Sequence, residues 1–170
     1  MYKRQANPAS TEWPAQNGLN VITNQTVAAT KEIISNYKKT WESSAQTSDQ
    51  LPCLGMTRYL VISKSKETAL SSARRAYPVW RKSFMALWDL HGKEPIGVRY
   101  PETFDGLMEK GQGFAGTSAE VLDVIGNQIQ EGGINYFVSR FAFGNLTYEE
   151  SSESIRLFAE DVMPQLSKLT

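Results

Sequence analysis

The stretch that decides the fold is GFAGTSAEVLDVIGNQIQEGGINYFVSRF, residues 113–141. Within it, Thr117 and Glu120 form a capping box, the pattern that marks the start of a helix. Apolar residues then recur at helical spacing, and the Gly-Gly pair at 132–133 ends the helix with the residue type that tolerates positive φ. The run 134–141 is the clearest strand pattern in the chain. Together these patterns predict a β/α unit of a largely parallel sheet.

The same alternation of short apolar runs and longer helical patterns extends along the chain. Further strands are predicted at 19–23 and 56–63, with a short one at 113–115, and further helices at 10–16, 26–43, 65–88, 102–110 and from 147 onward. In the helix at 65–88, Pro78 must cause a bend or a break, because proline removes a helical donor.

A second capping box, Thr147 with Glu150, opens the terminal helix. The spacing predicts a core face made of Ile155, Phe158, Ala159, Val162 and Leu166.

The number of these units sets the fold class, which is α/β with about four parallel β/α units. A complete (β/α)8 TIM-type barrel takes about 250 residues. A chain of 170 residues therefore has the content of half a barrel. Because half a barrel leaves two unpaired sheet edges, we expect the chain to associate with itself as a homo-oligomer.

Composition excludes several classes of protein. The chain has 18 Lys+Arg and 18 Asp+Glu, without the basic excess of a nucleic-acid-binding protein. Its apolar runs are too short for a membrane span, and the N-terminus lacks the apolar core of a secretory signal. The single cysteine, Cys53, allows neither an internal disulfide nor a cysteine-based metal site. We therefore expect a cytoplasmic protein that binds no metal, membrane or nucleic acid.

Four groups of residues resemble the luciferase-like, flavin-dependent monooxygenases. In chain order they are Asn7–Trp13 with Asn17-Gly18-Leu19, then Gly116–Val121, then Gly132-Gly133-Ile134 with Arg140–Gly144, and finally Leu157–Pro164. The groups follow one another in the order of the family, at compatible spacing, and bracket residues 6–166. The resemblance implies that residues 1–170 are a single partial domain, the C-terminal half of a TIM-type barrel. Residues 1–5 do not resemble family sequence and are expected to be a leader outside the domain.

The resemblance also implies an activity. Such a barrel binds reduced flavin mononucleotide (FMN), or in some members the deazaflavin F420, and uses O2 to oxidise a small organic substrate. The implied partner is a flavin reductase or another supply of reduced flavin. We expect the full-length parent to be a monooxygenase and the fragment alone to be inactive. Two alternatives stay open, a flavin-binding module without catalysis and an inactive truncated fragment.

The cofactor residues implied by the resemblance are Asn7, Ser10 and Thr11, which lie in the turn that holds the flavin phosphate in the family. Unpaired N–H groups at a helix start favour an anion there. Alternatively, Ser10 or Thr11 simply caps the helix.

The predicted substrate pocket contains Arg140, Phe141 and Phe143, because they lie at the C-terminal end of the last strand, where barrel enzymes keep their chemistry. The alternative is that alternate residues of this run simply pack inside and outside the barrel, while Arg140 pairs with a nearby carboxylate.

Gly111–Gly116 fits the G-x-G-x-x-G dinucleotide pattern. It follows a predicted helix rather than a buried strand, so we prefer a turn at the barrel rim. No catalytic residue can be assigned from the sequence.

Overall fold

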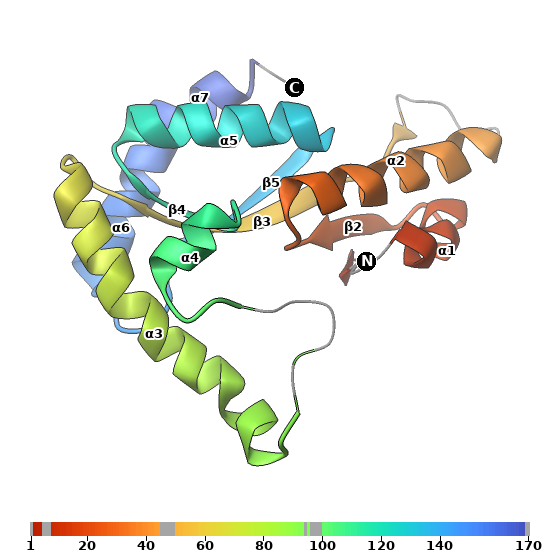
Figure 1. The fold of residues 1–170 in the computed structure, drawn as a ribbon. Coiled ribbons are helices and arrows are strands. Elements are labelled where there is room, and N and C mark those ends of the chain that lie inside the picture. The colour runs from red at the N-terminus through yellow and green to blue at the C-terminus, as the bar shows by residue number, and fades with distance from the viewer. Residues whose placement is uncertain (1, 5–7, 45–49, 94, 96–99, 169–170) are drawn as a thin grey trace. The chain divides into compact units, whose positions relative to one another are not determined.

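The computed structural model describes residues 2–4, 8–44, 50–93, 95 and 100–168. Helices and strands alternate along it, as Figure 1 shows. The strands are β1 (Tyr2–Arg4), β2 (Asn20–Thr23), β3 (Leu54–Ile62), β4 (Gly113–Gly116) and β5 (Tyr136–Arg140). The helices are η1 (Pro8–Thr11), α1 (Glu12–Gln16), α2 (Val27–Ser43), α3 (Lys66–Leu90), α4 (Phe104–Glu109), α5 (Ser118–Gly132), α6 (Tyr148–Leu157), η3 (Phe158–Val162) and α7 (Met163–Leu166).

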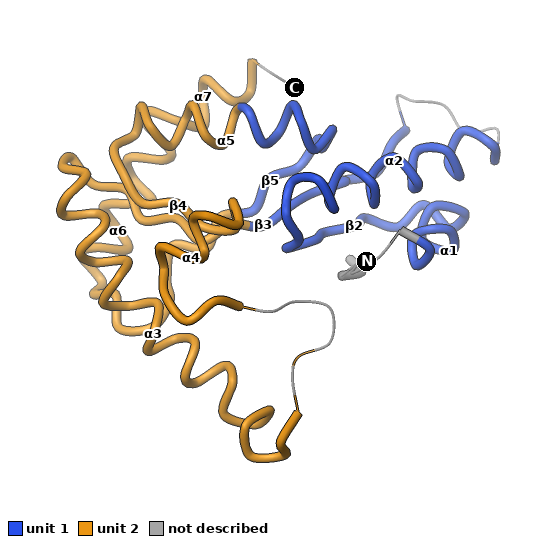
Figure 2. Tube along the Cα trace, in the orientation of Figure 1, with its two compact units in different colours: residues 1–57, 127–138 blue, residues 58–126, 139–170 orange. Residues whose placement is uncertain are grey.

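The chain forms two compact units, shown in Figure 2. Unit 1 comprises residues 1–57 and 127–138, and unit 2 comprises residues 58–126 and 139–170. Strand β3, helix α5 and strand β5 each begin in one unit and end in the other.

In unit 1, β2 lies between β1 and the start of β3. Both pairings are parallel, with Lys3 opposite Val21 and Ile22 opposite Gly55. Next to the start of β5, which also pairs with β3, the Asn135 backbone N–H donates to the Leu54 carbonyl at 3.0 Å. Strand β1 was not predicted, because a run of three residues carries too little pattern to recognise.

In unit 2, the second half of β3 pairs with β4 in parallel, with Leu60 opposite Phe114. The G-x-G-x-x-G stretch thus contains a strand, as the prediction at 113–115 required. The parallel sheet and the half-barrel-like α/β fold predicted from the sequence are confirmed.

Both predicted capping boxes form. The Thr147 N–H donates to the Glu150 carboxylate at 2.8 Å, and the Glu150 N–H donates back to the Thr147 hydroxyl at 3.2 Å. At the start of α5 the corresponding distances between Thr117 and Glu120 are 3.0 and 3.5 Å. Each box satisfies two backbone groups that a helix start leaves unpaired, and so fixes where the helix begins.

Two details of the predicted helices need comment. Of the bend or break predicted at Pro78, the break is absent, since α3 continues as one helix through the proline, with Ala76 and Tyr77 in the core just before it. The predicted core face of the terminal helix is also displaced, because a π-helical turn, η3, interrupts it. Ile155 is 50% exposed, whereas Leu157 is buried. Ala159 is likewise exposed, and the wider π turn returns Val162 and Leu166 to the core.

Each unit has its own buried interior. In unit 1, the apolar face of α2 packs in the interior with residues of β2 and β3; the buried side chains are Val21, Ile33, Ile34, Tyr37, Trp41, Leu54 and Met56. In unit 2, aromatic residues dominate, and Tyr59, Tyr77, Tyr100, Phe104 and Phe143 are all buried. Among the described residues, no helix is long and apolar enough to cross a membrane.

Candidate functional site

Tyr59, on β3, is the centre of an aromatic cluster in unit 2. Its ring lies 4.8 Å from that of Trp80 and 5.3 Å from that of Phe143, between ring centres. Tyr77 and Tyr100 approach it edge-on at 6.2 and 6.4 Å. These five aromatic residues are called the Tyr59 cluster below. Since offset and edge-on ring pairs add stability beyond burial alone, the cluster is a well-packed part of the core.

Arg140 extends this cluster from the end of β5. Its guanidinium carbon lies 4.7 Å from the centre of the Tyr59 ring, within the range of a cation–π contact. Its Nη1 also donates a hydrogen bond to the Tyr59 hydroxyl at 2.5 Å. Arg140 therefore binds both the face and the hydroxyl of the same tyrosine.

The phenol of Tyr59 is held in its neutral form. Burial raises its pKa well above the ordinary value, and although the charge of Arg140 acts in the opposite direction, burial dominates. Tyr100 contributes to the rise through its own side-chain hydrogen bond to Tyr59. Arg140, Tyr59 and Tyr100 thus form a polar chain inside an aromatic environment.

The structure brings together two of the three predicted substrate residues. Arg140 and Phe143 both contact Tyr59, and Phe143, 7% exposed, stacks in parallel with Phe104 at 6.2 Å. Phe141 contacts Phe158 instead, at 5.3 Å. Phe141 and Phe143 follow the end of β5, and they contact different aromatic partners, so Phe141 is not part of the Tyr59 cluster. A role of these residues in substrate binding stays a prediction.

The predicted phosphate turn lies in unit 1, where η1 leads directly into α1. Asn7 is outside the described residues. Thr11 is fully buried, and its hydroxyl accepts a hydrogen bond of 2.7 Å from the Asn36 side chain on α2. Thr11 occupies the N-cap position of α1 but makes no side-chain capping bond, so capping by Thr11 is not what its hydroxyl does. Ser10 is half-buried and is the predicted contact with an accessible side chain.

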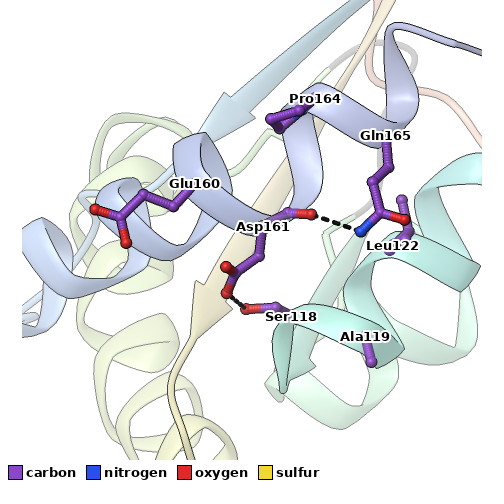
Figure 3. A pocket seen from close by; sticks show the side chains of 7 residues that line it. All are labelled: Ser118, Ala119, Leu122, Glu160, Asp161, Pro164 and Gln165. Carbon is purple, nitrogen blue, oxygen red and sulfur yellow. Dashed lines mark hydrogen bonds between the residues drawn. The ribbon is translucent and has the colours of Figure 1, made fainter.

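A cavity of about 580 Å³ lies elsewhere in unit 2, between the start of α5 and the end of the chain. Figure 3 shows its lining. Ser118 donates to the Asp161 carboxylate at 2.7 Å, and the Gln165 amide donates to the Asp161 carbonyl at 2.9 Å. The sequence analysis did not predict this cavity. It did single out both segments, since Ser118 and Asp161 belong to two of the four motifs that carry the family resemblance.

The sequence analysis also did not single out Arg58. It is 1% exposed, although it lies next to Tyr59 on β3, and burial lowers the pKa of its guanidinium to about 10. A charged residue within the apolar run 56–63 was the available signal, because arginine is rarely fully buried unless it has a partner.

The sequence of this chain has a curated relative among known proteins, but no protein-family model matches it. An uncharacterised protein, y4wF of Sinorhizobium fredii (strain NBRC 101917 / NGR234), is 30% identical over 159 residues, which cover 94% of this chain and 46% of that protein. The chain thus spans about half the length of the curated relative it matches.

Solved structures identify the fold. The monooxygenase RslO1 from Streptomyces bottropensis superposes with a TM-score of 0.75 at 20% identity, over 96% of this chain and 47% of that one. The oxygenating constituent of 3,6-diketocamphane monooxygenase from Pseudomonas putida, in complex with FMN, gives 0.70 at 12% identity, again over 96% and 47%. The structural neighbours of this chain are luciferase-like flavin-dependent monooxygenases, as its motifs predicted, and the shared feature is the fold of about half their barrel.

Proposed function

We propose that this chain is the C-terminal half of a flavin-dependent monooxygenase, in which reduced FMN and O2 oxidise a small organic substrate. The observation that carries the proposal is the superposition of nearly the whole chain on two monooxygenases, one of them bound to FMN. The motifs at both ends of the chain support it, because they occur in the family's order.

Ser10 is the proposed contact to the FMN phosphate. Its side chain is half-buried at the junction of η1 and α1, while the neighbouring Thr11 is fully buried and its hydroxyl accepts a hydrogen bond from the Asn36 side chain. The donor chemistry at this turn therefore fits a phosphate through Ser10 and not through the Thr11 side chain. The carboxylate of Glu12, exposed in the first turn of α1, repels the negatively charged phosphate and so limits the affinity for FMN.

The Tyr59 cluster is the proposed apolar wall on the substrate side. Its packed rings give this side of unit 2 an apolar interior, and Arg140 fixes the orientation of the neutral Tyr59 hydroxyl. A bound reduced flavin supplies the electrons for oxygen chemistry, and the protein supplies position and polarity. In this role Arg140 is a positioning residue and Tyr59 a neutral hydrogen-bonding group.

The remaining parts of the activity come from outside the chain. A flavin reductase or an equivalent source supplies reduced flavin, and the rest of the barrel completes the site. We therefore expect the isolated chain to bind FMN more weakly than a full-length parent, and F420 is the competing cofactor.

Titration with FMN and riboflavin, followed by flavin fluorescence, tests the proposal. Ser10→Ala should weaken FMN binding by about 1–3 kcal/mol through loss of a charge-assisted hydrogen bond. Riboflavin lacks the phosphate and should be unaffected. Ser167→Ala, at an exposed serine near the end of α7, is the matched control. Equal losses for both flavins, or equal losses in Ser10→Ala and the control, would refute phosphate contact at Ser10.

A further inference from the structure

The C-terminal half of α3 carries an apolar face that the described residues of unit 2 leave exposed. The fully buried residues of the helix end at Tyr77. Beyond it, Trp80 and Phe84 pack against the core from one side of the helix. In Figure 1 this half of α3 extends past the strands and the other helices of unit 2.

The exposed face has the spacing of a helix-pairing seam. Val79, Ser83, Ala86 and Leu90 follow one another at intervals of four, three and four residues, and Leu87 borders them. Val79 is 43% exposed, Leu87 71% and Leu90 74%. Intervals of four and three place side chains on one stripe of a helix, as in the a and d positions of a coiled coil. Large apolar side chains so exposed, on one stripe, mark an interaction surface.

The stripe is complementary to itself in the antiparallel direction. If two copies of α3 cross near Ser83 and Ala86, Ser83 of one copy meets Ala86 of the other, and Val79 meets Leu90. Small residues at the crossing point allow the two helices to approach closely, while larger apolar residues fill the interface at both ends. This arrangement has two-fold symmetry, so every contact occurs twice.

The charges beside the stripe fit the same arrangement. Lys82 and Asp89 are exposed and seven residues apart, which places both on the same side of the stripe. In the antiparallel pair, Lys82 of one copy lies within about one turn of Asp89 of the other, twice over. Among the described residues neither takes part in an ion pair. A parallel pair would instead place the two Lys82 side chains on opposite sides of the stripe, away from Asp89 of the other copy.

We propose that this face of α3 is the interface of a homodimer, in which α3 pairs antiparallel with α3 of a second copy of the chain. The occupant is a second copy because both the apolar residues and the charges match their own reversed order. One pair of helices gives a small interface, so the dimer should be weak and concentration-dependent. The inference is independent of the proposed function, since it involves no residue of the flavin turn or the Tyr59 cluster.

Sedimentation equilibrium over a range of protein concentrations tests the interface. The wild-type chain should shift from 19.0 kDa toward twice that mass as concentration rises. Leu90→Glu should raise the dissociation constant at least about tenfold, because it places a charge in the apolar seam. Ile155→Glu, at a 50%-exposed isoleucine on α6, is the matched control and should leave it unchanged. A monomer at every concentration, or equal effects of the two variants, would overturn the proposal.

Charge reversal tests the direction of pairing. Lys82→Glu should raise the dissociation constant of the dimer several-fold at low salt, because it places a negative charge close to the negative charge of Asp89 of the other copy. The double variant Lys82→Glu with Asp89→Lys should restore it. Failure of the second substitution to restore a dimer weakened by the first would exclude the antiparallel pairing.

A disulfide test fixes the register. In a Cys53→Ser background, a mixture of Val79→Cys and Leu90→Cys chains should form a mixed disulfide on mild oxidation. Val79→Cys alone should not, because its two copies lie about 16 Å apart at 1.5 Å of helix per residue. A disulfide between two Val79→Cys chains would indicate parallel pairing and contradict the proposal.

Discussion

The Tyr59 cluster contains two of the predicted substrate residues, the turn at Pro8–Thr11 contains two of the predicted cofactor residues, and the two regions differ in how far these side chains are buried. In the cluster, Phe143 is buried, and Arg140 is held by the ring and hydroxyl of Tyr59. In the turn, Thr11 is buried in the structure, but Ser10 beside it is accessible. A buried residue contributes first to stability, whereas a partly exposed polar residue can be reached by a ligand. Substitutions in the two regions should therefore separate stability from binding.

The largest expected loss of stability is at Gly144, just after Phe143. Its φ is +59°, and a Cβ atom there would overlap the carbonyl oxygen of Ala76 on α3. Gly144→Ala should lower the free energy of unfolding by more than about 3 kcal/mol, since strain at positive φ adds to a backbone clash.

Gly92 is the matched control for this substitution. Its φ is +57°, but nothing lies within 4 Å of a Cβ built there. Gly92→Ala should cost only about 1–2 kcal/mol in urea denaturation. Similar losses in the two variants would show that the clash between residue 144 and α3 does not add to the loss of stability.

The next largest effect separates the two phenylalanines. Phe143→Ala should cost about 3–5 kcal/mol, as expected for a buried aromatic residue. Phe141→Ala should cost about 1–2 kcal/mol, because Phe141 is only half-buried against Phe158. Thermal and urea unfolding would measure both. If Phe143→Ala leaves stability unchanged, the Tyr59 cluster is not packed as described.

High pH should weaken unit 1 through Tyr37. Its hydroxyl donates to the Leu19 carbonyl at 2.9 Å, and burial raises its pKa from 10.0 to about 12. Between these two pH values the unfolded chain releases this proton while the folded chain retains it. Folding stability should therefore fall by about 1–2 kcal/mol as pH rises through this window.

Tyr37→Phe removes this contribution. The variant should lose less stability between pH 10 and 12 than the wild type in urea titrations, although the raised pKa values of Tyr59 and Tyr77 leave part of the slope. An unchanged slope would contradict the assignment to Tyr37.

The last comparison, which includes the smallest expected effect, is between the neighbours Ser10 and Thr11. Thr11→Val should cost about 1–3 kcal/mol of stability, since it leaves the Asn36 amide without its buried acceptor. Ser10→Ala should change stability by no more than about 0.5 kcal/mol. Should Ser10→Ala prove the more destabilising of the two in thermal melts, Ser10 would be a structural residue.

Local sequence patterns predicted most of the fold. Capping boxes at Thr117 and Thr147 and the periodicity of α2 and α5 depend on neighbours in the chain, so the sequence displays them directly. The π turn at the end of α6 depends on tertiary packing, and that is why Ile155 and Ala159 were wrongly assigned to the core.

The candidate site was harder to predict because its contacts are long-range. Arg140 meets Tyr59 across 81 positions, and Ser118 meets Asp161 across 43. The sequence indicated that Arg140 lies at the end of a strand, but it did not indicate that Tyr59 is its partner. Likewise, the bond between Thr11 and Asn36, 25 positions away, leaves no local signal, and a phosphate contact of Thr11 stays a prediction from the family resemblance.

Phosphorus NMR of FMN tests the central claim most directly, because the phosphate reports its own environment. Addition of the wild-type chain should shift and broaden the phosphate resonance, and Thr11→Val, whose hydroxyl faces Asn36, should preserve most of that change. Ser10→Ala should largely abolish it at equal protein concentration. A resonance that the wild-type chain leaves unperturbed, or that responds equally to the Ser10→Ala chain, would contradict a flavin phosphate bound at this turn.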